Sequence, residues 1–176
     1  MALDHVKSTF ITNLDASPSV QNTAGEGGPA PLKLVDGWAT GVASSNIDST
    51  YQFVRIPSNA KVKQLVFETE SQTVGVGDLG LYYATDGEGK QPTALLAAAA
   101  IDRDFFASLY SLVSVTTPVD VTNESTTYTV DKRAQPIWQA VGLTSDPGGY
   151  FDIVLTLSTA ITTGTGKMGL KCFYTD

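Results

Sequence analysis

Apolar and polar residues alternate along much of the chain with the two-residue period of β-strands. Residues 50–56 (TYQFVRI) alternate throughout, and residues 61–70 (KVKQLVFETE) do so with one shift of phase at Gln64–Leu65, which predicts a β-bulge. The residues between them, PSNA, are turn formers, because proline fixes φ and asparagine tolerates the left-handed region. These two strands are therefore expected to form an antiparallel hairpin.

The same pattern predicts further strands at 79–85, 110–117 and 126–130. The last two strands, 150–161 and 167–175, flank the glycine-containing connection TTGTG, which predicts a second hairpin. One face of the final strand carries Met168, Leu170, Cys172 and Tyr174. Cys172 is thus expected in or near the core, and a nucleophilic role for it is disfavoured.

Helical signals are few. Residues 131–143 are the best candidate, because Pro136 is tolerated in a first helical turn and Gly142 can end a helix. Residues 93–109 contain an alanine run with helix propensity but lie among strands, so their structure stays open. The pattern as a whole predicts an all-β fold, a jelly-roll-like antiparallel β-sandwich with one or two short helices and an extended N-terminal arm.

The beginning of the chain differs from the rest. Between residues 12 and 31 the only large aliphatic side chains are Leu14 and Val20, and the segment NTAGEGGPAPLK is rich in glycine and proline. Such a segment does not build a core by itself. We predict an extended N-terminal arm at 1–33, ordered along neighbouring chains, and a β-sandwich body at 34–176. A plain disordered tail is the alternative.

Composition and charge limit the kinds of partner that the chain is expected to bind. The 176 residues suit one domain. Lys and Arg number 11 against 18 Asp and Glu, a net charge of −7, which has the wrong sign for binding a phosphate backbone, so no nucleic-acid partner is expected. Charged residues make up only 16% of the chain, so the surface is expected to be largely Ser, Thr, Asn and Gly, which suits packed partners as well as it suits water. No apolar run approaches 18 residues, and the start lacks a signal-peptide pattern, so no membrane partner is expected.

Candidate catalytic and metal-binding residues are sparse. His5 is the only histidine and lies in the start that is predicted to be unstructured, which argues against a Ser–His–Asp device. One cysteine and one histidine do not make a zinc site, and we expect no metal and no cofactor. GVGDLG at 75–80 has the glycine spacing of a dinucleotide-binding loop, but a strand follows it, so a hairpin loop is the better interpretation.

Two pairs of acids, Asp102/Asp104 and Glu68/Glu70, occupy alternate positions. A hydrolase that uses such pairs is the weaker interpretation, and solvated acids are the stronger one. The chain is not expected to be an enzyme.

Aromatic residues supply core packing and leave some surface for a partner or a stacked sugar. The members of Tyr82–Tyr83 and of Phe105–Phe106 are expected to point to opposite faces of their strands. The aromatic residues weighed in this way are Trp38, Tyr51, Tyr82, Tyr83, Phe105, Phe106, Tyr110 and Trp138. The candidate partner-interface residues are Phe10, Ile11, Leu14, Val20, Pro29, Pro31, Tyr83, Phe106 and Trp138.

Three stretches resemble structural proteins of tailed bacteriophages. They are DHVKSTFITNLDASPSVQNTAGEGGPAPLK, VTNES and DKRAQPIWQAVGLTSDPGGYFDIVLTLS. The chain looks most like the small capsid cement, or decoration, proteins of short-tailed phages. This resemblance implies a non-enzymatic β-sandwich, often a homodimer, on the outer surface of the capsid of a virion assembled in the host bacterial cytoplasm. Its partner would be the major capsid protein, and its role would be to stabilise the head against the pressure of packaged DNA.

A second class of function stays open. The same sandwich architecture can present aromatic residues to sugars, so a carbohydrate-binding, lectin-like head-fibre or receptor-binding module is the alternative.

Overall fold

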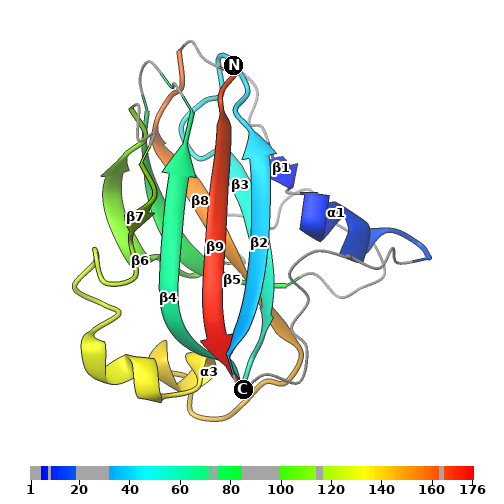
Figure 1. The fold of residues 1–176 in the computed structure, drawn as a ribbon, viewed down its shortest axis with the longest axis vertical. Coiled ribbons are helices and arrows are strands. Elements are labelled where there is room, and N and C mark those ends of the chain that lie inside the picture. Colours follow the sequence, from blue (N-terminus) through cyan, green and yellow to red (C-terminus); the bar gives the residue numbers. More distant parts are fainter. Residues whose placement is uncertain are drawn as a thin grey trace.

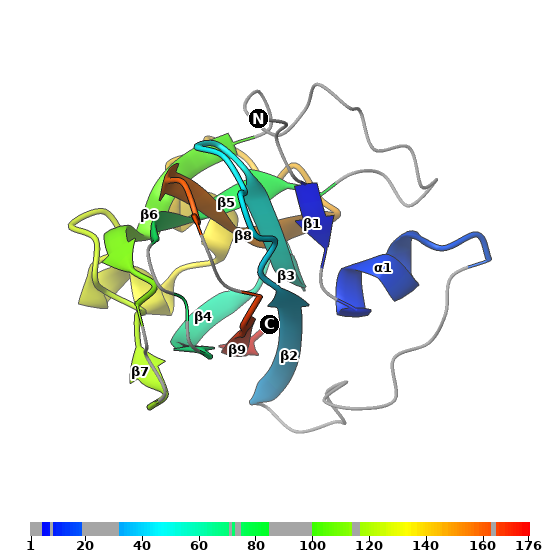
Figure 2. The same ribbon diagram turned by 90° about the horizontal axis from the view of Figure 1, so that it is seen from above.

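Two β-sheets pack face to face in the computed structural model (Figure 1), and the view from above shows the strands in two layers (Figure 2). The residues that the structure describes are 5–7, 9–18, 32–70, 72, 75–84, 100–113, 117–162 and 165–176. Sheet A has the strand order β1-β3-β8-β5-β6, and sheet B has the order β2-β9-β4-β7. The prediction of an all-β sandwich is confirmed.

The strands are β1 (His5–Lys7), β2 (Lys33–Thr40), β3 (Thr50–Pro57), β4 (Lys61–Thr69), β5 (Val76–Tyr83), β6 (Ala100–Ser111), β7 (Val119–Asp120), β8 (Tyr150–Thr159) and β9 (Lys167–Thr175). The short helices are α1 (Thr9–Asp15), the 3₁₀ turn η1 (Val130–Ala134) and α3 (Ile137–Ala140).

Most strands that follow one another in the sequence lie in opposite sheets; the exception is β5 and β6, which pair with each other in sheet A. β3 pairs with β8 in sheet A, whereas β4 pairs with β9 in sheet B. The two predicted hairpins, 50–56 with 61–70 and 150–161 with 167–175, are therefore wrong. In the turn at 57–60 the Ala60 N–H donates to the Pro57 carbonyl at 3.0 Å. Such a turn can connect two strands of one hairpin or two strands in different sheets. Crossing between sheets lets successive strands bury opposing faces against each other.

The core lies between the sheets and is aromatic at its centre. Phe53 of β3 meets Phe67 of β4 edge to face, with ring centroids 5.9 Å apart. Met168, Leu170 and Cys172 are fully buried, which confirms the shared face predicted for the last strand. Burial in this apolar setting raises the pKa of the Cys172 thiol.

Two local predictions about the sheet B side are confirmed in part. The register of β4 with β9 shifts between Val62 and Gln64, so the predicted bulge exists and begins one residue earlier. Residues 131–143 form two short helical pieces, η1 and α3, with Pro136 directly before α3 and Gly142 at a positive φ of 93° after it.

The segment 126–130 is not a strand, although its residues are β-branched and aromatic. Residues 126–128 form bends, and Val130 is the first residue of η1. Tyr128 is fully buried there, and its hydroxyl donates to the Val62 carbonyl at 2.7 Å. Of the predicted strand 110–117, only the first two residues belong to β6. Residues 100–109, left open above, lie in β6, and 93–99 lie outside the described residues.

Adjacent aromatic residues behave differently in β5 and β6. Tyr82 and Tyr83 point to opposite faces of β5, as predicted. The buried residue is the outward-facing Tyr82, whose hydroxyl lies 2.5 Å from Thr156 Oγ1, while Tyr83 packs against the core residue Phe151 and is still 46% exposed. Phe105 and Phe106 are both fully buried, so the prediction that they face opposite ways into core and solvent is wrong. Tyr128 packs against both rings, at centroid distances of 5.2 and 5.1 Å, and so covers the side of β6 that solvent would otherwise reach.

Gly80 permits the kink in β6. Leu79 lies opposite Ala107, but Leu81 lies opposite Asp102, so β6 carries extra residues that arch over the intervening glycine. A Cβ at Gly80 would lie 2.1 Å from the carbonyl oxygen of Arg103, a backbone atom.

Replacing Gly80 by alanine should therefore lower the free energy of unfolding by about 3 kcal/mol, because either β5 or β6 must move. Gly169→Ala is the matched control, since a Cβ there would meet only the Glu68 side chain at 3.4 Å. The control should change stability by less than about 0.5 kcal/mol. Urea unfolding of both variants measures the difference, and equal stabilities would show that β6 does not cross Gly80 closely.

Candidate functional site

The start of the chain packs on sheet A. β1 pairs in parallel with β3, with His5 opposite Thr50, and the His5 Nδ1 lies 3.2 Å from the Thr50 Oγ1. Ile11 of α1 is fully buried. The expectation that His5 lies in an unstructured start is wrong, because strand pairing and apolar burial both act on these residues. The body boundary at residue 33 stays a prediction, since 19–31 lie outside the described residues.

A buried ion network fastens this segment to the sheet. The Arg55 guanidinium donates to both carboxylate oxygens of Asp152, from Nε at 2.7 Å and from Nη2 at 3.0 Å. Its Nη1 donates to Asp15 Oδ1 of α1 at 2.9 Å, and Lys7 Nζ binds the other Asp15 oxygen at 2.6 Å. Burial raises the pKa of Asp152, and the Arg55 guanidinium opposes that shift.

The outer faces of the two sheets differ. In β8 the core-facing residues and the outward-facing Asp152, Val154 and Thr156 are all buried, so the centre of sheet A is enclosed on both sides. In β2 of sheet B the outward-facing Asp36 and Trp38 are exposed. Sheet B therefore offers an accessible face, and sheet A at β8 does not.

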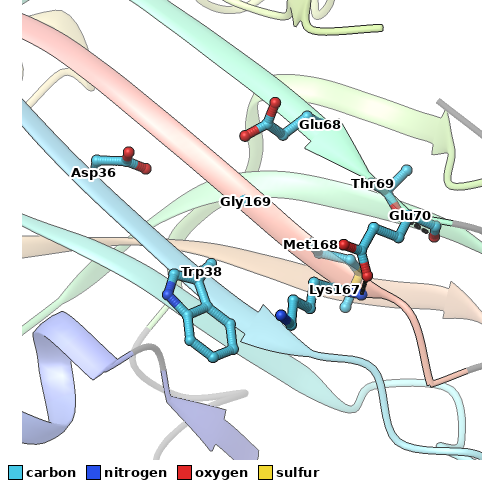
Figure 3. A pocket seen from close by; sticks show the side chains of 8 residues that line it. All are labelled: Asp36, Trp38, Glu68, Thr69, Glu70, Lys167, Met168 and Gly169. Carbon is cyan, nitrogen blue, oxygen red and sulfur yellow. Dashed lines mark hydrogen bonds between the residues drawn. The ribbon is translucent and has the colours of Figure 1, made fainter. Parts of the chain in front are cut away.

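A hollow of about 540 Å³ lies on this accessible face of sheet B. Trp38 of β2 and Glu68 of β4 both stand opposite Gly169 of the central strand β9, so the missing side chain of that glycine leaves a gap between them. Figure 3 shows Asp36 and Trp38 on one side of strand β9 and Glu68 and Glu70 on the other.

Charged groups at the hollow are held in place by neighbours. The Lys167 ammonium lies 5.2 Å from the centre of the Trp38 ring, within the range of a cation–π contact. The Lys171 ammonium lies 3.4 Å from Glu68 Oε1. Burial raises the pKa of Asp36, Glu68 adds to this shift, and Lys171 opposes it.

A second exposed region lies at the end of the sandwich that carries α3, the lower end in Figure 1. The Ala84 N–H donates to the Tyr150 carbonyl, which brings Tyr83 and Tyr150 to this end at 46% and 58% exposure. Leu32, 51% exposed, precedes β2 at the same end, beside the C-terminal strand. We call Leu32, Tyr83 and Tyr150 the α3-end surface.

The predicted interface residues are thus distributed over several environments. Tyr83 is exposed, while Trp138 and Leu14 are half-buried, and Trp138 packs against the core. Ile11 and Phe106 are fully buried, so their side chains are not on the surface of this chain. The side chain of Phe10 and the residues Val20, Pro29 and Pro31 lie outside what the structure describes.

Sequence reasoning did not single out Tyr150, Leu32 or the grouping around Gly169. Tyr150 precedes the buried Phe151, and this alternation is the signal that marks it as outward-facing. The hollow has no local signal, because its residues come from three strands.

The motifs weighed for chemistry have structural roles. Residues 76–80 of GVGDLG lie inside strand β5, so the hairpin-loop interpretation is wrong, and the chain stays extended to Tyr83, where a nucleotide loop would open a helix. The Asp104 N–H donates to Asp102 Oδ1 at 3.3 Å, and burial together with Asp104 raises the pKa of Asp102. Within the described ranges no cluster of three His, Cys, Asp or Glu side chains is placed to hold a metal. No described helix is long and apolar enough to cross a membrane.

Comparison with solved structures finds chains of similar fold. A chain in the solved capsid of Ralstonia phage GP4 matches with a TM-score of 0.62 at 11% identity, over 99% of this chain and 98% of that one. A chain of the cyanophage Pam1 capsid asymmetric unit matches with a TM-score of 0.49 at 12% identity, over 91% and 95%. No family model and no curated protein matches the sequence. At such identities the first likeness establishes a shared fold.

The geometry of the ion network predicts a ranking of stability losses for three substitutions. Asp152→Asn should lower the free energy of unfolding by about 3–5 kcal/mol, because the buried Arg55 loses its bidentate partner. Asp15→Asn should cost about 1–3 kcal/mol, since Arg55 keeps Asp152. The control is Asp48→Asn, which weakens an exposed pair with Arg103 and should cost less than about 1 kcal/mol. Chemical denaturation ranks the three, and Asp15→Asn indistinguishable from Asp48→Asn would mean that α1 is not fastened through Arg55.

Proposed function

We propose that this chain is a structural protein of a phage virion, and that it acts as a cement or decoration protein on the outer face of the capsid shell. The observation that carries the proposal is the fold shared with a chain of the Ralstonia phage GP4 capsid over nearly the full length of both. The resemblance of the sequence to phage cement proteins supports the same role. Its partner is then the major capsid protein.

The α3-end surface is the proposed attachment site of the body. Tyrosine and leucine side chains there are about half exposed, and such residues act as anchors when a partner covers them. Residues 19–31, the centre of the predicted arm, precede Leu32 at this end. An arm that starts here and lies along a neighbouring capsid subunit would extend the same interface, with Val20, Pro29 and Pro31 as contacts.

The body suits a clamp. Its two sheets enclose an aromatic core, and the Arg55 network ties β3, β8 and α1 together. A rigid body loses little conformational entropy on binding, so a larger share of the contact energy remains for holding subunits together. A homodimer, as the resemblance implies, would join two such clamps.

Removing the aromatic anchors should weaken attachment. Tyr83→Ala combined with Tyr150→Ala is expected to lower affinity for empty shells of the encoding phage about tenfold or more, because two half-exposed rings lose their contacts. Co-sedimentation with the shells measures it. Ile47→Ser is the control, being exposed in the loop between β2 and β3 at the opposite end. Wild-type chain that fails to sediment with shells would refute the cement role, whereas an unaffected double variant would refute only this attachment site.

The arm is tested separately from the packed start of the chain. Residues 19–31 are replaced by a Gly-Ser linker of equal length, which keeps β1 and α1 connected. We expect the melting temperature to stay within a few degrees of the wild type and affinity for shells to fall, because the linker lacks the proline and valine contacts. Unchanged affinity would show that this segment is a tether and not a contact.

A further inference from the structure

The hollow on sheet B has the construction of a ligand site that the cement role does not use. It lies towards the end of β2 at Thr40, away from the α3-end surface at the start of that strand. Its volume of about 540 Å³ falls in the range of small-molecule sites in proteins.

Trp38 provides a flat apolar wall. It is 48% exposed, although indole rings usually gain most by burial, and it stands in the row Trp38–Gly169–Glu68 across three strands. Its position is fixed by strand pairing and by the Lys167 ammonium. A ligand that stacks on this ring would pay little for ordering it, because the side chain is already held.

The polar groups around the ring include both acceptors and donors. Asp36, Glu68 and Glu70 line the hollow with carboxylate oxygens, and Lys167 lines it with an ammonium donor, while the Lys171 ammonium lies beside it and pairs with Glu68. The lining carries three negative groups and one positive group, and Lys171, paired with Glu68, offsets part of the excess negative charge. A strongly charged ligand gains little from such a set, whereas a ligand rich in hydroxyl groups can donate to the acids and accept from the lysines.

From this arrangement we propose that the sheet B hollow binds a neutral saccharide, with one sugar ring stacked on Trp38 over Gly169 and its hydroxyl groups bonded to Asp36 and Glu68. Because Gly169 has no side chain, the sugar ring has room to lie in the hollow beside Trp38. The proposal does not depend on the cement role, since the two surfaces are separate.

The test uses the full chain against a printed array of neutral, amino and acidic oligosaccharides, followed by calorimetric titration of the neutral trisaccharides that bind. We expect neutral sugars to bind, Trp38→Ala to weaken binding about tenfold or more, and Trp38→Phe to weaken it less. Gly169→Val, which fills the gap, should weaken binding while the protein stays folded. Ile47→Ser, with the same exposure but outside the hollow, should bind as the wild type does.

Three outcomes would overturn the proposal. The first is an array without neutral-sugar binding, and the second is Trp38→Ala binding as tightly as wild type. The third is evidence that the hollow binds another partner. A second copy of the chain would be shown by loss of dimer mass in Trp38→Ala, measured by light scattering, and a basic peptide by binding of tetra-arginine in place of sugars. Trp38→Ala should still sediment with shells, so failure here and failure of the cement role give different results.

Discussion

The pairing of Arg55 with Asp152 on the outer side of sheet A is the interaction on which the rest of the structure depends. A guanidinium enclosed at this depth is costly unless its donors are satisfied, and Asp152 and Asp15 satisfy three of them. The first partner ties β3 to β8, and the second brings in α1. One residue in the middle of the chain thus fixes both the order of two strands and the docking of the N-terminal segment.

This constraint also decides which surfaces remain available. With sheet A buried on both sides at β8, the sandwich has one open sheet face and two ends. The open face carries the hollow at Gly169, and the end near α3 carries the exposed tyrosines. The division arises from packing, because the residues that enclose sheet A leave sheet B with only its core-facing side covered.

The sequence predicts where the strands lie better than it predicts which strands pair with each other. A period of two identifies a strand and its core-facing side, as it did for Met168, Leu170 and Cys172 of β9. It does not identify the partner strand, since the turn at 57–60 looks the same in a hairpin and in a corner between sheets. Tyrosine is common in strands, but Tyr128 lies outside any strand and packs over Phe105 and Phe106. No local sequence pattern predicts this contact. Trp38 and Glu68 likewise meet only through the register of β9.

The separation of the two surfaces has a consequence for function. The hollow lies near the end of β2, whereas the α3-end surface lies at the beginning of that strand, so the two surfaces are separated along the strand. A body attached to a shell by the α3 end would keep Trp38 in contact with solvent. An anchor and a recognition surface can then coexist on one small sandwich, because β2, β9 and β4, the strands that space them apart, pack on the core.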